Sequence, residues 1–265
     1  MRWTVVVPVF NELDFLPRTV ESLIAQTELC HLILVDNGST DGCIDAVRPM
    51  LAEHPGPVTL LSEPEPGQVH ALRRGIDAVD SEFVAICDAD TWYPPHYLAR
   101  ATALFDAGGA GRVMLGAWLN PDHGGIQDAV RARRHRLAAA WLWPRQNHTA
   151  GSAQLFRTDA LRRAGGYSPT AWPYVLKDHE LAHRVLKLGT QSYDRDLWCV
   201  SSSRRADRRG VRWTLFERLM YHFTPFAVKD WFFYRFLADR FRRRGLRDTV
   251  LRDQSWSTSP TGEIR

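Results

Sequence analysis

Four short apolar runs, each followed by polar residues, most constrain the fold of this 265-residue chain. The runs lie at residues 3–10, 32–35, 58–61 and 83–87. Runs of this length favour buried strands, and the helical spacing of Leu16, Val20 and Leu23 after the first run favours a connecting helix. Strands that alternate with helices form a doubly wound parallel sheet. We therefore expect an α/β fold in which the polar residues after each strand gather along one edge of a mostly parallel sheet.

Weaker patterns mark the remaining elements. They predict helices at 67–79 and 178–188 and a short strand near 197–200. The section from 112 to 143 is less regular and predicts an Arg-rich helix near 127–142. The polar residues from Gln254 onward are typical of a disordered terminus.

The composition is that of a globular protein, with 45% hydrophobic residues. Four cysteines without CxxC spacing are interpreted as reduced packing residues of a cytoplasmic protein. The first residues lack the pattern of a signal peptide. No uncharged apolar stretch approaches the roughly 20 residues that span a bilayer. We expect a cytoplasmic protein without a membrane-spanning helix.

Positive charge is concentrated near the C-terminus. Residues 204–265 contain 15 Lys and Arg against 7 Asp and Glu, whereas the first 203 residues contain 19 against 23. This surplus predicts an anionic partner, and the lack of a recognisable reading module disfavours nucleic acid. Over residues 213–244 aromatic residues are interleaved with Arg and Lys, which is typical of a helix lying at a membrane surface. A helical pair packed on the rest of the protein or on a second subunit would produce the same pattern.

Two carboxylates follow the fourth run, in Cys87-Asp88-Ala89-Asp90. Because side chains alternate along an extended chain, Asp88 and Asp90 are expected to point the same way at the edge of the sheet. Two close like charges are unfavourable unless a cation or hydrogen-bond donors lie between them. The pattern indicates a metal site, and the alternative is a helix cap with a second, exposed acid.

Five blocks of residues, in this order, resemble family 2 glycosyltransferases, which are inverting nucleotide-sugar transferases with the GT-A fold. The blocks are Val5–Glu12, Val35–Asp41, Cys87–Asp90, Gly151–Arg157 with Ala164–Tyr167, and Lys177–Leu181. They extend over about three quarters of the chain. The resemblance implies a Rossmann-like half that binds the nucleotide sugar, to which this chain adds a helical, aromatic and basic C-terminal extension.

The resemblance also implies a donor site. Pro8, Asn11 and Glu12 would line the nucleoside pocket, and Asp36 and Asn37 would lie near the base. A UDP-sugar is the donor that we expect. Without the family context, Asp36 and Asn37 are equally explained as turn and capping residues.

In the same resemblance Asp90 is the more direct metal ligand, and Asp88 contacts the ribose or the metal. Oxygen ligands suit Mn²⁺ or Mg²⁺, either of which would neutralise a departing diphosphate. Arg73 stands where many relatives have Asn. It is either a contact to the diphosphate or an exposed helix residue.

On the acceptor side the resemblance puts Asp178 in the position of the general base and Glu180 in a supporting position. Gly151 belongs to the acceptor loop. Lys177, where relatives often have an acid, departs from the family pattern. Further candidates for donor or acceptor contacts are His148, Arg204 and Arg205, with structural or solvated roles as the alternative.

These patterns predict a catalytic domain over 1–210, divided into a nucleotide-sugar-binding half (1–110) and an acceptor half (111–210). A helical extension (211–253) and a disordered tail (254–265) follow. The expected activity is inverting transfer of a sugar to a hydroxyl of a glycan or lipid-linked acceptor. Peripheral contact with the inner face of the cell membrane is expected if the extension is interfacial.

Two other classes of protein compete with this interpretation. A nucleotidyltransferase also binds nucleotides at a sheet edge, but it normally has a Gly-rich basic loop after the first strand, where this chain has Asn11-Glu12-Leu13-Asp14. A noncatalytic sugar-nucleotide-binding or membrane-adaptor protein would bind the donor without turnover.

Overall fold

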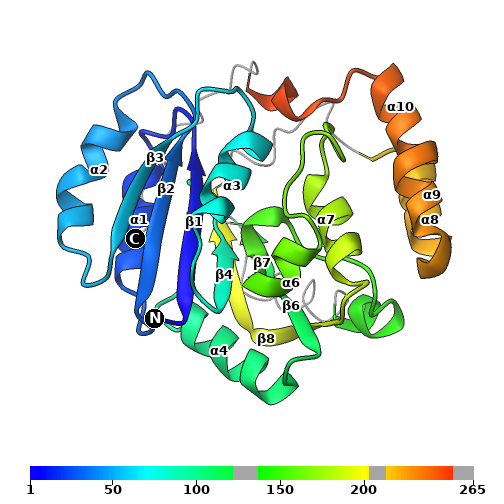
Figure 1. The fold of residues 1–265 in the computed structure, drawn as a ribbon, viewed down its shortest axis with the longest axis horizontal. Helices are drawn as coiled ribbons and strands as arrows, with labels where there is room; N and C mark the ends of the chain where they lie inside the picture. The colour runs from blue at the N-terminus through cyan, green and yellow to red at the C-terminus, as the bar shows by residue number, and fades with distance from the viewer. Residues whose placement is uncertain (122–136, 203–212, 253–265) are drawn as a thin grey trace.

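The computed structural model describes residues 1–121, 137–202 and 213–252. They form a mixed sheet covered on both faces by helices, with a further group of helices beside it (Figure 1). The predicted tail from residue 254 and part of the predicted helix at 127–142 lie outside the described residues.

The described residues contribute eight strands to one sheet, in the order β3-β2-β1-β4-β7-β6-β8-β5. The strands are β1 (Trp3–Val9), β2 (Cys30–Asp36), β3 (Val58–Ser62), β4 (Phe83–Ile86), β5 (Thr91–Trp92), β6 (Arg112–Pro121), β7 (Gln154–Arg157) and β8 (Thr190–Ser201). Strands β1 to β4 are parallel, β7 runs antiparallel to both β4 and β6, and β8 is parallel to β6. The carboxyl ends of the first four strands therefore meet at one edge.

Helices connect and cover these strands. The main helices are α1 (Leu16–Ile24), α2 (Cys43–Ala52), α3 (Gln68–Asp77), α4 (Tyr97–Gly108), α6 (Thr158–Arg163) and α7 (Lys177–Val185). The C-terminal group consists of α8 (Leu215–Phe223), η3 (Phe226–Val228), α9 (Lys229–Trp231), the π-helical η4 (Phe232–Leu237), α10 (Ala238–Arg243) and η5 (Asp248–Leu251). The short η1 (Gly151–Ala153) precedes β7.

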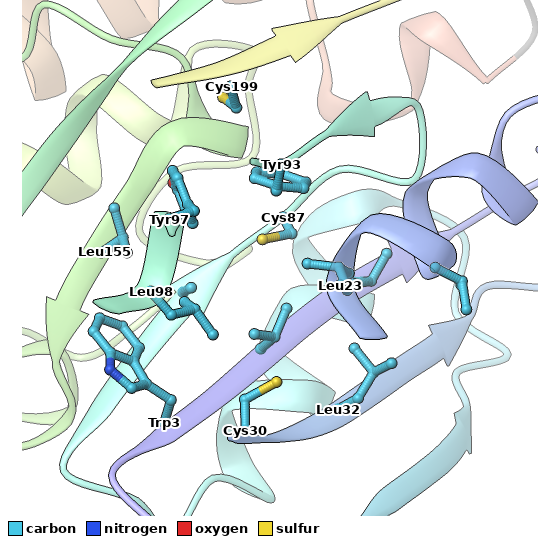
Figure 2. Packing of buried hydrophobic residues seen from close by; sticks show 14 of the residues in the cluster. Trp3, Leu23, Cys30, Leu32, Cys87, Tyr93, Tyr97, Leu98, Leu155 and Cys199 are labelled. Atoms are coloured by element: carbon cyan, nitrogen blue, oxygen red, sulfur yellow. The ribbon is translucent and has the colours of Figure 1, made fainter. Parts of the chain in front are cut away.

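Alternation along the strands divides the core into two layers. In β1, Val5 and Val7 belong to a cluster with α1, α2 and α4, whereas Val6 belongs to a cluster with α3, α6 and α7. Figure 2 shows part of the first cluster, with Trp3 and Cys30 on neighbouring strands. Gly75 lets α3 lie close to the sheet, since a Cβ atom there would be 2.4 Å from a methyl group of Val6. This packing holds α3 against β1 and β2.

The C-terminal helices share a third core with the acceptor half. Trp172 and Val175 pack with Tyr221, Phe232 and Phe233 from the C-terminal group. Nine-tenths or more of each of these side chains is buried. The aromatic residues of the extension therefore include a face that packs on the rest of the protein, as one of the two alternatives predicted.

Most of the predicted elements agree with the structure. The four apolar runs form β1 to β4, and the helices predicted at 67–79 and 178–188 are α3 and α7. The four cysteines are buried and form no disulfide, as expected. The prediction of an irregular section from residue 112 was wrong, because residues 112–121 form the ten-residue strand β6.

Candidate active site

A cavity of about 380 Å³ opens at the carboxyl ends of β1, β2 and β4. The N-terminal ends of α3 and α7 and the C-terminal segment around η5 complete its wall. It brings together these predicted site residues: Pro8, Asn11, Glu12, Asn37, Asp88, Asp90, Gly151 and Asp178. The sheet edge predicted to carry the site is thus the floor of this cavity.

The segment after β1 is joined to the turn after β2 by hydrogen bonds between backbone amides and side chains. Asn11 Oδ1 accepts a hydrogen bond from the Thr40 amide at 2.8 Å, and the Asn11 amide donates to Ser39 Oγ at 3.1 Å. Asn11 has φ 52°, a conformation that non-glycine residues seldom adopt and that is common at functional sites. The β1 and β2 ends therefore form one connected wall.

Asn37 is 4% exposed and holds the loop that follows β3. Its Nδ2 donates to the carbonyl oxygens of Glu63 and Glu65 at 2.8 and 2.7 Å. Its Oδ1 accepts from the Gly67 amide at 2.9 Å and from Arg252 Nη1 at 2.8 Å. Because both amide hydrogens are already donated, the side chain can offer only its oxygen to a ligand.

Asp88 and Asp90 are half-buried and line the cavity, whereas Cys87 before them and Ala89 between them are buried in the first core cluster. This is the alternation predicted from the sequence, although β4 itself ends at Ile86. Gln68 Nε2 donates to Asp88 Oδ1 at 3.1 Å, and Ser202 Oγ donates to Asp90 Oδ2 at 2.9 Å.

A buried tyrosine supports this pair from below. The Asp88 amide donates to the Tyr93 hydroxyl at 3.0 Å, and that hydroxyl donates to the Ser152 carbonyl at 2.9 Å. Burial raises the pKa of Tyr93 well above its ordinary value, so the hydroxyl keeps its proton. Tyr93 thereby joins the Asp88 loop to η1 on the other side of the cavity.

Asp88 and Asp90 suit a hard divalent cation, since both side chains offer carboxylate oxygens as ligands. The part of the chain described by the structure gathers no cluster of three or more His, Cys, Asp or Glu residues that could hold a metal. Asp88 and Asp90 are thus the residues that would hold such an ion, with the remaining ligands supplied by substrate or water.

Asp178 lies across the cavity on the first turn of α7. The Asp178 backbone carbonyl accepts a hydrogen bond from Gln154 Nε2 at 3.1 Å. A Cβ atom added to Gly151 would lie 3.3 Å from the Cβ of Asp178. Leu176, directly before α7, has φ 61° and also lines the cavity. Both non-glycine residues with positive φ among the described residues, Asn11 and Leu176, thus border this cavity.

Lys177 pairs with the carboxylate of Asp248 and not with that of its neighbour Asp178. Its ammonium group forms a short ion pair with Asp248 of η5. Asp248 Oδ2 also accepts from the Val69 amide at 2.9 Å, at the N-terminal end of α3. The departure from the family pattern at Lys177 therefore serves a contact with the C-terminal segment.

Four predicted residues lie outside the cavity wall. Asp36 accepts from the Ser39 amide at 2.9 Å and shapes the turn, and Arg73 is exposed on α3. His148 Nε2 lies 3.0 Å from the Trp143 carbonyl, and burial lowers the pKa of this imidazole. Glu180 is 1% exposed and binds Arg184 through both oxygens at 2.7 and 2.9 Å. The predicted contacts Arg204 and Arg205 lie outside the described residues.

Sequence reasoning missed several residues of the wall. They are Gln68, Tyr167, Asp248 and Arg252. Gln68 opens the predicted helix at 67–79, and Tyr167 belongs to a block that carried the resemblance, so both had a local signal. Arg252 had only the general positive charge of the C-terminal region as a signal, and Asp248 had none.

A mixed sheet with a cavity and two neighbouring carboxylates at its carboxyl edge is the arrangement expected of a nucleotide-binding enzyme with the GT-A fold. The model of the family described as glycosyl transferase family 2 matches residues 4–165. The chain belongs to this family, and the resemblance inferred from its motifs is confirmed.

Two curated relatives illustrate the range of similarity. The uncharacterized glycosyltransferase alr2836 of Nostoc sp. is 30% identical over 184 residues, which cover 65% of this chain and 56% of the relative. The undecaprenyl-phosphate 4-deoxy-4-formamido-L-arabinose transferase of Serratia proteamaculans is 33% identical over 111 residues, covering 40% of this chain and 34% of the relative. This chain thus spans about half or less of the length of these two relatives.

Solved structures show the same fold. A mannosyltransferase from Pyrobaculum calidifontis, in complex with GDP-Man and Mn²⁺, has a TM-score of 0.66 at 24% identity. The match covers 91% of this chain and 69% of that one. TarS 1–349 of S. aureus, in complex with UDP-GlcNAc, has a TM-score of 0.60 at 18% identity, covering 91% and 73%.

Proposed function

We propose that this protein transfers a sugar with inversion from a nucleoside-diphosphate sugar, in the first instance a UDP-sugar, to a hydroxyl of a glycan or lipid-linked acceptor. One observation carries the proposal: Asp88 and Asp90 on the nucleotide side and Asp178 on the other side line the same cavity. Inverting transfer in a single displacement needs a group that stabilises the leaving diphosphate on one side of the anomeric carbon and a base for the acceptor hydroxyl on the other side.

Asp178 has the role of general base. It would take the proton of the acceptor hydroxyl as the oxygen attacks the anomeric carbon, and the bond from that carbon to the diphosphate breaks. Gln154 and Gly151 hold its position, the first by a hydrogen bond to the backbone and the second by leaving room. Burial raises the pKa of Tyr167 above its ordinary range, so this neighbour stays neutral at the wall.

The charge of the cavity supports a divalent cation. The wall carries the carboxylates of Glu12, Asp88, Asp90, Asp178 and Asp248 against two cations, Lys177 and Arg252. An anionic diphosphate would be repelled by this wall unless a cation lies between them. Mn²⁺ or Mg²⁺ held by Asp88 and Asp90 would supply that charge and stabilise the departing diphosphate. The Mn²⁺ of the Pyrobaculum enzyme supports the same assignment.

The acceptor is proposed to be lipid-linked, because the outer surface of the C-terminal helices suits a membrane. Leu215, Leu219 and Phe223 follow one another at helical spacing on α8 and are 74%, 45% and 71% exposed. Phe216 packs on Phe236 with a ring separation of 5.8 Å, and Phe236 stacks on the half-exposed Trp231. We call these six residues the α8 surface.

An anionic lipid surface matches the charge around the α8 surface. Arg240 lies over the rings of Phe216 and Phe236, and Arg242 and Arg243 are exposed on α10. Aromatic side chains flanked by arginines are typical of helices that lie in the membrane interface. No helix in the described part of the chain is long and apolar enough to cross a membrane. The undecaprenyl phosphate in the name of the Serratia relative supports a lipid carrier as acceptor.

The direct test of the donor site is a thermal-shift panel of UDP-, GDP- and dTDP-sugars, each with and without Mn²⁺. We expect one nucleotide class to stabilise the protein, with a larger shift in the presence of Mn²⁺. Asp90→Asn should abolish the metal-dependent part of the shift, whereas Asp45→Asn, an exposed acid on α2, should leave it unchanged. Stabilisation by none of the nucleotides would refute the proposed function.

A further inference from the structure

The segment after α10 returns across the cavity. Gly245, with φ 66°, ends the helix, and residues 246–252 then pass toward the ends of β1 and β2 (Figure 1, red). Tyr174 and Arg247 form an antiparallel bridge, and the Val175 amide donates to the Leu246 carbonyl at 3.1 Å. We call residues 246–252 the C-terminal strap.

The strap joins the two sides of the cavity. On the acceptor side, Asp248 pairs with Lys177 at the start of α7. On the nucleotide side, the same carboxylate accepts from the Val69 amide at the start of α3, where a negative charge is favoured. The Asp248 side chain is only 8% exposed. The strap is therefore fixed in place before its last residue, Arg252, reaches the nucleotide side.

Arg252 lies on the wall formed by β1 and β2. Its guanidinium carbon is 3.5 Å from the centre of the Phe10 ring. Its Nη1 donates to Asn37 Oδ1 at 2.8 Å, and its Nη2 donates to the Asn37 carbonyl oxygen at 2.9 Å. The group thus uses one aromatic face and two acceptor atoms at the carboxyl end of the sheet.

A nucleobase uses interactions of the same kind. It is planar, it stacks on aromatic side chains, and its edge forms hydrogen bonds in the plane of the ring. An N–H group on that edge, such as the imide of uracil, needs an acceptor, and Asn37 Oδ1 and the Asn37 carbonyl oxygen are acceptors at this end of the sheet. Asn37 Nδ2 already donates to the carbonyl oxygens of Glu63 and Glu65, so Asn37 meets a base through its oxygens. Arg252 holds both of these oxygens and the Phe10 face.

We propose that Arg252 is a built-in competitor of the nucleobase, so that the donor binds only when the guanidinium leaves Phe10 and Asn37. This inference rests on the proposed function, because it assumes that the ligand of the cavity is a nucleotide. When the competent state is only part of the population, the apparent dissociation constant rises by the inverse of that fraction. Arg252 therefore weakens nucleotide binding and selects for bases that can replace its hydrogen bonds.

Whether loss of Arg252 tightens or weakens nucleotide binding distinguishes a competitor of the base from a cation that attracts the phosphates. Loss of an arginine normally weakens the binding of an anion, because a positive charge is lost. Here Arg252→Ala frees the base platform, so binding should become tighter. Arg252→Lys keeps the charge but loses the planar group and its paired donors, and it should also tighten binding. Arg247→Ala is the matched control, since this exposed arginine of the same strap does not line the cavity.

The test is titration calorimetry with UDP and with GDP, each in the presence of Mn²⁺, using the full chain. We expect the dissociation constant to fall roughly tenfold in Arg252→Ala, as for a site in which the guanidinium covers Phe10 and Asn37 in about nine-tenths of the molecules. Uridine, which lacks phosphate, should show the same gain, and Arg247→Ala should bind as the unaltered protein does. A cooperative thermal transition in each variant verifies that it is folded.

Two results would overturn the proposal alone. Weaker binding in Arg252→Ala would make Arg252 a direct contact to the donor, and unchanged binding would show that it does not cover the base site. If the unaltered protein and all variants bound neither UDP nor GDP, the proposed function would fail and this inference with it. The first two results leave nucleotide binding intact, so the two failures are distinguishable.

Discussion

At the scale of single residues, Asp178 is held in place by a residue without a side chain. Gly151 faces it so closely that an added Cβ would lie 3.3 Å from the Asp178 Cβ, a contact that requires a shift of a few tenths of an ångström. Small displacements of a reacting group reduce rate strongly, because catalysis depends on alignment. The position of the base is thus sensitive to its neighbour.

Gly151→Ala should therefore lower kcat about three- to tenfold while the donor KM stays nearly constant. Steady-state kinetics with the donor identified by binding would measure both constants. Gly111→Ala is the control, because no atom lies within 4 Å of the Cβ added there. An equal loss in both variants, or a loss confined to donor KM, would argue against this positioning role.

Three carboxylates of the cavity wall, Asp88, Asp90 and Asp178, could be predicted from the sequence because each belongs to a local pattern. Asp88 and Asp90 follow a buried strand at a spacing of two, and Asp178 begins a helix. Asp248 and Arg252 could not be predicted in the same way. Their partners Val69 and Asn37 are 179 and 215 residues away in sequence, so only the folded chain brings them together.

At the scale of elements, the parallel strands were predictable and the later strands were not. The runs that form β1 to β4 are short, continuous and apolar, as buried parallel strands are. In β6 the register with β8 shifts twice, between Arg112 and Met114 and between Gly116 and Trp118. Such bulges interrupt the alternation by which a strand is recognised, so residues 112–121 looked irregular.

The α8 surface is the element whose function is most open to test. Leu219→Ser with Phe223→Ser should reduce binding to phosphatidylglycerol vesicles at least tenfold, since each buried apolar side chain contributes about 1.5–3 kcal/mol. Leu29→Ser with Leu60→Ser is the matched control, because both leucines are exposed elsewhere, at 47% and 37%. Vesicle sedimentation measures the effect.

Phosphatidylcholine vesicles should bind the unaltered protein more weakly, and added salt should reduce binding to the anionic vesicles. Equal binding of the two double variants would exclude the α8 surface as the membrane contact. Failure of the unaltered protein to bind anionic vesicles would have the same consequence.

At the scale of the whole molecule, the described C-terminal helices pack on the rest of the chain. Their aromatic core includes Trp172 and Val175 of the acceptor half, and their last segment pairs with Lys177 and Asn37 across the cavity. The α8 surface, which we propose contacts a membrane, and the C-terminal strap, which we propose competes with the nucleobase, belong to one continuous stretch of chain, residues 213–252.

The central claim is that Asp178 removes the acceptor proton in a cavity where Asp88 and Asp90 hold the donor. Turnover of the identified nucleotide sugar by Asp178→Asn, measured beside its donor dissociation constant with Mn²⁺, tests this most directly. We predict that turnover falls by at least about 100-fold while the dissociation constant changes less than about threefold, because a general base acts on the rate. Unchanged turnover in Asp178→Asn would contradict the account.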